Sequence, residues 1–158
     1  MIRQCEPRDT STLVTLAEQT GVFKPPEIVA LQEVLDDYHA GDHPEARCVT
    51  YEKDGEPIGF AYYAPAAMTD RTWQLWWIAV SKHTQTRGVG GRLLHHVEED
   101  IRRQNGRQLL IETSSLPHYE PTRRFYLKHH YDQAGLQPDY YADGDDMVIF
   151  RKRLEVKP

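Results

Sequence analysis

The sequence predicts an α/β (α+β) fold with about six strands and four helices. Two apolar stretches with helical spacing precede any long strand, and the dipeptide Asp54-Gly55 is typical of a β-hairpin turn. Residues 72–113 follow the order strand, loop, helix and strand, which is one βαβ crossover. Because 158 residues lie within the ~100–200 expected of one domain, we expect residues 1–158 to form a single domain.

The first elements are a short strand and two helices. The strand is expected at residues 2–5, and the first helix follows, with an N-cap among residues 9–11 and an end at Gly21. The second helix begins at Pro25, since proline fits a first helical turn, and ends at Gly41.

The middle of the chain changes to strand character. Residues 48–51 lead into Asp54-Gly55, and residues 58–63 are the return strand of an antiparallel pair. Residues 72–80 are rich in tryptophan and β-branched side chains, which predicts a central strand covered on both faces. Its three tryptophans are expected in the core or the wall of a cleft.

The remaining elements follow a polar, glycine-containing loop at residues 81–91. Apolar positions within residues 93–101 mark one face of a helix, and residues 108–113 form the next strand. A short helix is expected at residues 122–129. A closing strand at residues 147–150 follows a turn-rich acidic stretch.

Composition excludes several classes of protein. A net charge of −5 without a basic run disfavours nucleic-acid binding, and no apolar run approaches the ~20 residues of a membrane helix. The N-terminus has no signal-peptide pattern, so the cytoplasm is the expected compartment. Cys5 and Cys48 are far apart in sequence and lack a C-x-x-C partner, which favours buried free thiols. The acidic surface could help to collect a cationic amine.

The stretch Gln85-Thr86-Arg87-Gly88-Val89-Gly90 lies between a predicted strand and a predicted helix. Free backbone N–H groups and the helix dipole create an anion site there, glycines let phosphate oxygens approach the backbone, and Arg87 adds a charge. Neither G-x-G-x-x-G nor G-x-x-x-x-G-K-[ST] is present, so coenzyme A is the expected pyrophosphate carrier. The alternative is an ordinary strand-to-helix turn.

At these residues the chain resembles the GNAT superfamily of acyl-CoA-dependent N-acetyltransferases, whose signature is Q/R-x-x-G-x-G/A. The residues around Ile78 and the stretch 125–128 are similar to the family's fourth strand and late helix. The resemblance implies a mixed, mostly antiparallel sheet of about six to seven strands flanked by about four helices and splayed between strands 4 and 5. It also implies acetyl-CoA as co-substrate, with no metal.

The resemblance further implies a set of site residues. By position, Tyr126 resembles the family's general acid, and its alternative is a core tyrosine. The fourth-strand glutamate of some relatives is Gln74 here, which cannot take a proton, so Glu112 is the remaining candidate base. An ordinary strand-end carboxylate is as acceptable an interpretation of Glu112. The cofactor-binding candidates are Ile78, Val80, Gln85, Arg87, Gly88, Val89, Gly90, Gly91 and Tyr119.

The expected function is transfer of acetyl from acetyl-CoA to a primary amine of a small molecule or peptide by direct attack. The alternative is a non-catalytic acyl-CoA-binding or regulatory module. Tyrosines and aspartates within residues 140–146 offer a candidate rim for a cationic amine, although both are normal turn residues. The paired histidines at 95–96 and 129–130 lack metal-ligand spacing. Since the family often forms dimers, a homodimer is a further expectation.

Overall fold

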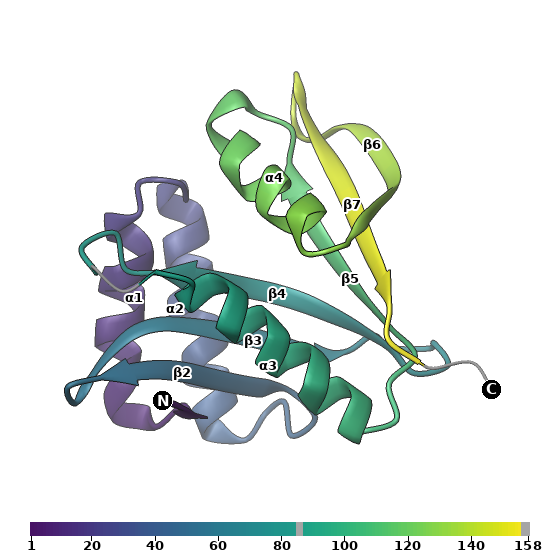
Figure 1. Cartoon of the computed structure of the whole chain (residues 1–158). Coiled ribbons are helices and arrows are strands. Elements are labelled where there is room, and N and C mark those ends of the chain that lie inside the picture. The colour runs from purple at the N-terminus through teal and green to yellow at the C-terminus, as the bar shows by residue number, and fades with distance from the viewer. Residues whose placement is uncertain (85–86, 156–158) are drawn as a thin grey trace. The chain divides into compact units, whose positions relative to one another are not determined.

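The computed structural model describes residues 1–84 and 87–155, and within them the chain forms seven strands and four α-helices (Figure 1). The sheet order is β1-β2-β3-β4-β5-β7-β6, with a parallel β4–β5 pair and antiparallel β1–β2, β2–β3, β5–β7 and β6–β7 pairs. This confirms the predicted fold class. The elements are β1 Ile2–Gln4, η1 Pro7–Asp9, α1 Thr10–Gln19, α2 Pro25–Ala40, β2 Arg47–Lys53, β3 Glu56–Pro65, β4 Thr72–Val80, α3 Val89–Arg103, β5 Gln108–Ser114, η2 Pro117–Tyr119, α4 Glu120–Lys128, β6 Asp132–Ala142 and β7 Asp145–Arg153.

The ends of the early elements agree with their local sequence signals. Gly21 and Gly41 follow α1 and α2 with φ of 70° and 83°, the left-handed conformation that glycine adopts at helix ends. Asp54 and Gly55 have φ of 52° and 81°, as a two-residue type I′ hairpin requires. None of the helices in residues 1–84 and 87–155 is long and apolar enough to cross a membrane.

The start of α1 lies within the predicted residues 9–11, but the expected side-chain cap is not formed. Asp9 occupies the N-cap position, but its side chain makes no capping hydrogen bond. Its carboxylate instead accepts two hydrogen bonds from Arg3, at 2.8 and 2.9 Å, and one from the backbone N–H of Glu6. Bidentate hydrogen bonds from an arginine stabilise a buried carboxylate, so an ion pair with Arg3, six residues earlier, satisfies the Asp9 side chain in place of a capping bond. The Arg3 hydrogen bonds lower the pKa of Asp9.

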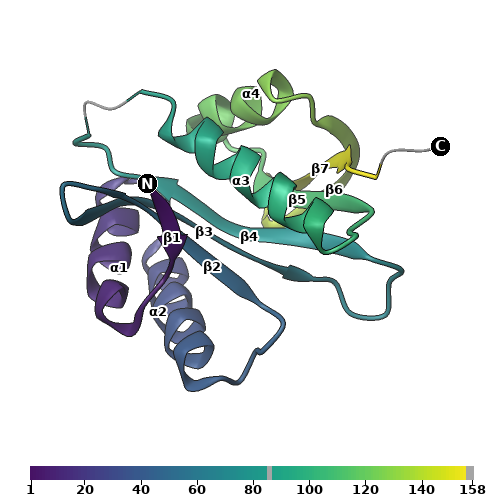
Figure 2. The same ribbon diagram turned by 60° about the horizontal axis from the view of Figure 1, so that its bottom comes forward.

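Two compact units divide the chain. Unit 1 comprises Met1–Ala64 and Trp77–Val97, and unit 2 comprises Pro65–Trp76 and the chain from Glu98 onward. In unit 1, α1 and α2 cover one side of β2 and β3, and the N-terminal half of α3 covers the other (Figure 2). A Cβ on Gly59 of β3 would lie 2.9 Å from Leu93 and 3.2 Å from Val89. A side chain at position 59 would therefore require Leu93 to shift where α3 approaches β3.

Unit 2 has two sheet faces with different surroundings. Trp73, Leu109 and Phe150 define the helix face, because Ile101 of α3 lies beside Trp73 at Gly106 and Tyr126 of α4 packs on Phe150. Side chains alternate along strands, so the neighbouring positions define the opposite face, called here the Gln74 face. Its members include Thr72, Gln74, Trp76, Gln108, Leu110, Glu112, Ile149 and Arg151.

The helix face of unit 2 contains a buried polar cluster. Glu98 of α3 accepts a hydrogen bond of 2.7 Å from the Tyr131 hydroxyl and bonds of 3.1 Å from Lys152 to both of its oxygens. Lys152 also donates to the carbonyl of His129.

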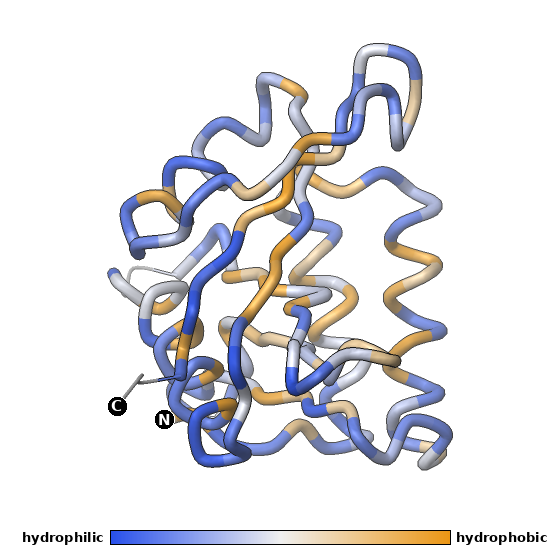
Figure 3. The backbone as a smooth tube through the Cα atoms, turned by 90° about the vertical axis from the view of Figure 1, so that its right-hand side faces the viewer, coloured by the Kyte–Doolittle hydropathy of each residue, from blue (hydrophilic) through white to orange (hydrophobic). Residues whose placement is uncertain are grey.

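In Figure 3, β7 changes from orange at residues 147–150 to blue at residues 151–153, which marks where its apolar stretch ends.

The structure adds one strand that the sequence pattern does not predict. Strand β6 has no alternation of buried and exposed residues, because nearly all of its positions are exposed. Gly135 and Pro138 weaken its strand signal further. Strand β6 exists because it pairs with β7.

A second difference concerns Trp76, which is 54% exposed and therefore not core, whereas Trp73 is buried and Trp77 packs 5.3 Å from the ring of Phe23.

Candidate active site

The N-terminus of α3 in unit 1 has the geometry of an anion site. Gly88 has φ of 78°, and a Cβ there would meet no atom within 4 Å. The helix begins at Val89, and the bond from Arg92 N–H to the Gly88 carbonyl, 3.0 Å, is its first i to i−4 bond. The N–H groups of the three preceding residues therefore have no intrahelical acceptor. These donors suit the pyrophosphate of coenzyme A.

Two of the predicted loop glycines belong to the helix. Gly90 and Gly91 lie in the first turn of α3, so the predicted loop over residues 81–91 is too long. Free first-turn N–H groups hydrogen-bond anions better than loop N–H groups of random orientation, because the helix aligns them with its dipole. Gln85, with its neighbour Thr86, lies outside the described residues.

The charge at this helix end is positive. Arg87 is exposed, and the first turn of α3 contains no acidic residue. Arg92, in the same turn, donates a 2.9 Å hydrogen bond to the hydroxyl of Tyr51. Sequence reasoning missed Arg92, although a cation in a first helical turn opposes the helix dipole unless an anion binds there. That conflict is the signal that could have identified it.

The end of β4 supplies the remaining unit 1 candidates. Ile78 and Val80 are half-buried, and the Ser81 N–H after them donates to the Ile58 carbonyl at 2.7 Å. The parallel ladder between β4 and β5 runs only from Thr72 to Leu75 in β4. Ile78 and Val80 therefore lie beyond the paired part of the strand. The ladder therefore ends before the strand does, which is the pairing pattern that a splay between strands 4 and 5 predicts.

The candidate base lies in unit 2. Glu112 is half-buried on β5, opposite Ile149 of β7, and therefore on the Gln74 face. Within the described residues its carboxylate has no hydrogen-bond or ion-pair partner. Ser114 instead bonds to the carboxylate of Asp145.

Tyr126, the candidate acid, lies on the helix face of unit 2. Its ring is buried and packs 5.6 Å from Phe150, 6.0 Å from Tyr131 and 5.5 Å from Phe125. Burial, and secondarily the nearby Tyr119, raises the pKa of its phenol. The hydroxyl therefore keeps its proton at neutral pH. Among the described residues, this hydroxyl has no hydrogen-bond partner.

Tyr119 is the one cofactor-binding candidate in unit 2. It is buried in η2, its ring lies 4.7 Å from that of His118, and it influences the pKa of Tyr126. The structure thus brings Tyr119 close to Tyr126. Glu112 lies on the opposite sheet face from Tyr126, so acid and base candidates reach the sheet from different sides.

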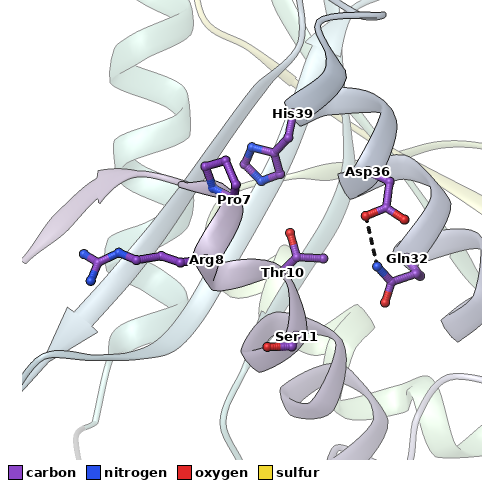
Figure 4. A pocket seen from close by; sticks show the side chains of 7 residues that line it. All are labelled: Pro7, Arg8, Thr10, Ser11, Gln32, Asp36 and His39. Carbon is purple, nitrogen blue, oxygen red and sulfur yellow. Dashed lines mark hydrogen bonds between the residues drawn. The ribbon is translucent and has the colours of Figure 1, made fainter.

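A polar pocket of about 460 Å³ lies in unit 1. Figure 4 shows His39 and Asp36 of α2 across from Pro7 and Thr10, with Gln32 bonded to Asp36 at 3.1 Å. His39 Nε2 lies 3.7 Å from the Cys5 thiol below. The pocket is open to solvent and contains no residue of the candidate site.

The thiols and histidines of the chain have structural surroundings of their own. Cys5 and Cys48 are buried and free, as predicted, and the Cys5 N–H donates to the Cys48 carbonyl at 2.9 Å. The hydrogen bond with Cys5 and burial raise the pKa of the Cys48 thiol. His130 has φ of 70° after α4, a left-handed conformation. The described part of the chain holds no metal-binding group of three or more ligands.

The acidic stretch before β7 is largely bonded within itself. Asp139 accepts a hydrogen bond from the Gly144 N–H at 2.8 Å, and Asp146 accepts one from the Asp139 N–H at 2.9 Å. Asp145 is buried, and its carboxylate accepts a hydrogen bond from the Ser114 hydroxyl. These contacts assign turn and strand roles to three of the aspartates.

A short parallel ladder, a strand that extends beyond it and a glycine turn at a helix N-terminus agree with the resemblance to acyl-CoA-dependent transferases. The chain belongs to the Acetyltransferase (GNAT) family, whose family model matches residues 13–131. It is therefore an acyltransferase, and acetyl-CoA is its co-substrate.

Solved structures agree with this assignment. A Desulfovibrio desulfuricans protein assigned to the GNAT family is 34% identical, with a TM-score of 0.92, 98% of this chain covered and 99% of that one. An aminoglycoside 6'-N-acetyltransferase complexed with coenzyme A is 19% identical, with a TM-score of 0.81 and coverage of 100% and 99%. A ribosomal-protein-alanine N-acetyltransferase from Brucella melitensis is 15% identical, with a TM-score of 0.79 and coverage of 98% and 99%. The last two show the shared fold alone. Among curated proteins, no sequence matches the chain.

Proposed function

We propose that this protein is an N-acetyltransferase that moves the acetyl group of acetyl-CoA to a primary amine of a small molecule or peptide. The observation that carries the proposal is the α3 N-terminus, where a left-handed glycine precedes three N–H groups without intrahelical acceptors. No nucleophilic side chain is required, because the amine itself attacks the thioester carbon.

The cofactor would be held mainly by backbone groups. The N–H groups of Val89, Gly90 and Gly91 donate to the pyrophosphate oxygens, Arg87 adds charge, and Gly88 leaves the approach open. Gln85 belongs to the same motif. Ile78 and Val80 lie beyond the end of the β4–β5 ladder, which supports a role for their backbone groups in binding the pantetheine arm and the thioester oxygen. Tyr119 lines the site.

Two proton transfers complete the reaction. The amine loses a proton as its C–N bond forms, and Glu112 accepts it directly or through water. The C–S bond breaks, and Tyr126 protonates the departing thiolate, leaving an amide and free coenzyme A. The absence of any partner for Glu112 among the described residues supports the first role. The raised pKa of Tyr126, which keeps its proton available, supports the second.

A cationic acceptor is the preferred substrate in this proposal. The net charge of −5 favours collection of cations by long-range attraction. Exposed Tyr140, Tyr141 and Asp143 supply an aromatic and acidic surface near the β6–β7 turn. Two proteins of the same fold are named for acceptors of these two kinds, an aminoglycoside and a ribosomal-protein alanine.

The proposal includes the organisation of the protein. Residues 1–158 act as one domain, tested by a single cooperative calorimetric transition. The cytoplasm keeps Cys5 and Cys48 as thiols. Exposed apolar side chains on the edge strand β6, such as Leu136, support a homodimer. Light scattering coupled to gel filtration measures that oligomeric state.

The decisive experiment is an acceptor screen. The protein is incubated with acetyl-CoA and polyamines, amino acids, aminoglycosides and peptides, and free thiol and the acetylated product are measured. Thiol release that depends on one amine class, with acetyl on its nitrogen, is the expected result. Thiol release that is equal with and without an amine would indicate hydrolysis of acetyl-CoA. Binding of acetyl-CoA without release of free thiol in the presence of any amine would favour a non-catalytic module.

A further inference from the structure

Gln74 of β4 is a buried side chain without a partner. The residue is 8% exposed, and its Nε2 is buried with no hydrogen bond. Its Oε1 has no hydrogen-bond partner within the described residues either. A buried polar group without a partner destabilises the folded state, which makes such groups rare in proteins.

Gln108 on the neighbouring strand is a matched counterexample. It pairs with Thr72 in the β4–β5 ladder and points to the same face as Gln74. Its Nε2 donates to the Thr72 hydroxyl at 3.0 Å, and its Oε1 accepts from Arg151 at 2.6 Å. One glutamine of this face is therefore bonded at both ends, whereas the other is bonded at neither.

The neighbours of Gln74 on its face are suited to an amine. Trp76, two residues further along β4 on the same side, is 54% exposed and offers an aromatic surface to a cation. Gln74 pairs with Leu110, and Glu112 is the next residue of β5 on that face. A donor, an aromatic ring and a carboxylate without a partner thus share one face of unit 2.

We propose that Gln74 is a positioning residue for the acceptor, and that its Nε2 donates a hydrogen bond to an oxygen next to the acceptor's amine. This rests on the proposed function. An amide cannot take a proton at neutral pH, so Gln74 orients the amine and leaves its deprotonation to another group. The favoured substrates are amines with a hydroxyl or carbonyl oxygen near the reacting nitrogen, such as amino alcohols, amino sugars and amino amides.

The test compares Gln74→Met with Gln108→Met, since methionine preserves length and removes the amide. Two acceptor pairs differ in the neighbouring oxygen: 2-aminoethanol and propylamine, and glucosamine and cyclohexylamine. Wild type should prefer the oxygen-bearing member. Gln74→Met should raise the KM for that member about 3- to 10-fold, the factor that one neutral hydrogen bond contributes. The KM for its partner, and the affinity for acetyl-CoA, should not change.

The control and the thermal data separate positioning from folding. Gln108→Met should lower the melting temperature and preserve the preference, because its hydrogen bonds are internal. Gln74→Met should melt at or above the wild-type temperature, since it removes an unsatisfied buried group. A preserved preference in Gln74→Met, or a melting temperature lowered as in the control, overturns the inference and leaves the proposed function standing. No turnover of any amine by wild type overturns both.

Discussion

On the helix face of unit 2, Glu98 receives hydrogen bonds from Tyr131 and Lys152, whereas on the Gln74 face neither Gln74 nor Glu112 has a partner among the described residues. Residues of the two faces alternate along the same strands. A difference between separate sequence segments therefore does not explain why the polar groups of only one face are paired. Paired buried groups support the fold, while unpaired ones cost stability and persist where a ligand needs them. Tyr126 is the exception on the helix face, because its hydroxyl has no partner within residues 1–84 and 87–155.

The largest effect on stability is expected from Glu98→Leu. The substitution leaves the Lys152 ammonium and the Tyr131 hydroxyl without their acceptor, and breaking such a pair should lower the free energy of unfolding by about 3 kcal/mol. Urea denaturation measures the loss. As a control, Glu120→Ala removes an exposed pair with Arg124 and should change the denaturation midpoint little. Equal losses in the two variants would contradict the comparison of paired and exposed groups.

Tyr126→Phe tests whether the Tyr126 hydroxyl on the helix face acts as the proton donor. Phenylalanine keeps the packing against Phe150 but deletes the proton donor, so turnover should fall about 10²-fold, at the low end of general acid catalysis. Binding of acetyl-CoA and the melting temperature should stay close to wild type, because no hydrogen bond to a described residue is lost. A turnover within a few-fold of wild type would assign Tyr126 to the core and leave the thiolate to depart unaided.

The pH dependence of stability provides a second measurement on Tyr126. Burial raises the pKa of the folded phenol above its unfolded value of about 10, so the folded state resists deprotonation. The stabilisation that this proton confers is complete below pH 10 and is lost as the pH rises above that value. Tyr126→Phe should therefore lose less stability than wild type between pH 9 and 11, as measured by thermal melts. Identical alkaline losses would exclude a titrating, buried Tyr126.

Glu112→Gln tests the unpaired carboxylate of the Gln74 face. If Glu112 removes the amine's proton, kcat/KM at pH 7 should fall about 10²-fold, because glutamine cannot accept it. The defect should shrink as the pH approaches the pKa of the amine, since the substrate then arrives neutral. A constant small defect across the pH range would show that solvent takes the proton.

Gly88→Ala compared with Gly21→Ala separates anion binding from backbone strain. Both glycines have positive φ, 78° and 70°, and neither has an atom within 4 Å of an added Cβ. Both substitutions should therefore cost similar stability, about 1 kcal/mol. Only Gly88→Ala should also weaken acetyl-CoA binding, about fivefold, which is the factor equivalent to ~1 kcal/mol. Calorimetric affinities that are equal in the two variants would exclude Gly88 from the pyrophosphate site.

The smallest effect is expected from Arg87→Ala. One exposed charge is lost while the backbone donors remain, so affinity for acetyl-CoA should fall only a few-fold and depend less on salt. Arg8→Ala, which removes an exposed arginine paired with Glu6, is the control. A salt dependence that is unchanged in Arg87→Ala, measured between low and moderate ionic strength, would remove Arg87 from the site.

Local sequence determined a large part of this protein. The positive φ angles of Gly21, Gly41 and the Asp54-Gly55 turn follow from residues that adopt them at low cost, and the glycine motif before α3 identifies the family. These features depend on neighbours along the chain. A strand such as β6, which has no buried face of its own, leaves no periodic signal and exists because β7 pairs with it.

Tertiary structure alone decided which polar groups found partners. Glu98 meets Lys152 from 54 residues away, and Asp9 bonds Arg3 instead of capping its own helix. Gln74 and Gln108 are the same residue type on the same face, yet only Gln108 lies where Thr72 and Arg151 can satisfy it. Hydrogen bonds act over about 3 Å, so their completion depends on the packing of distant segments, which no local pattern encodes.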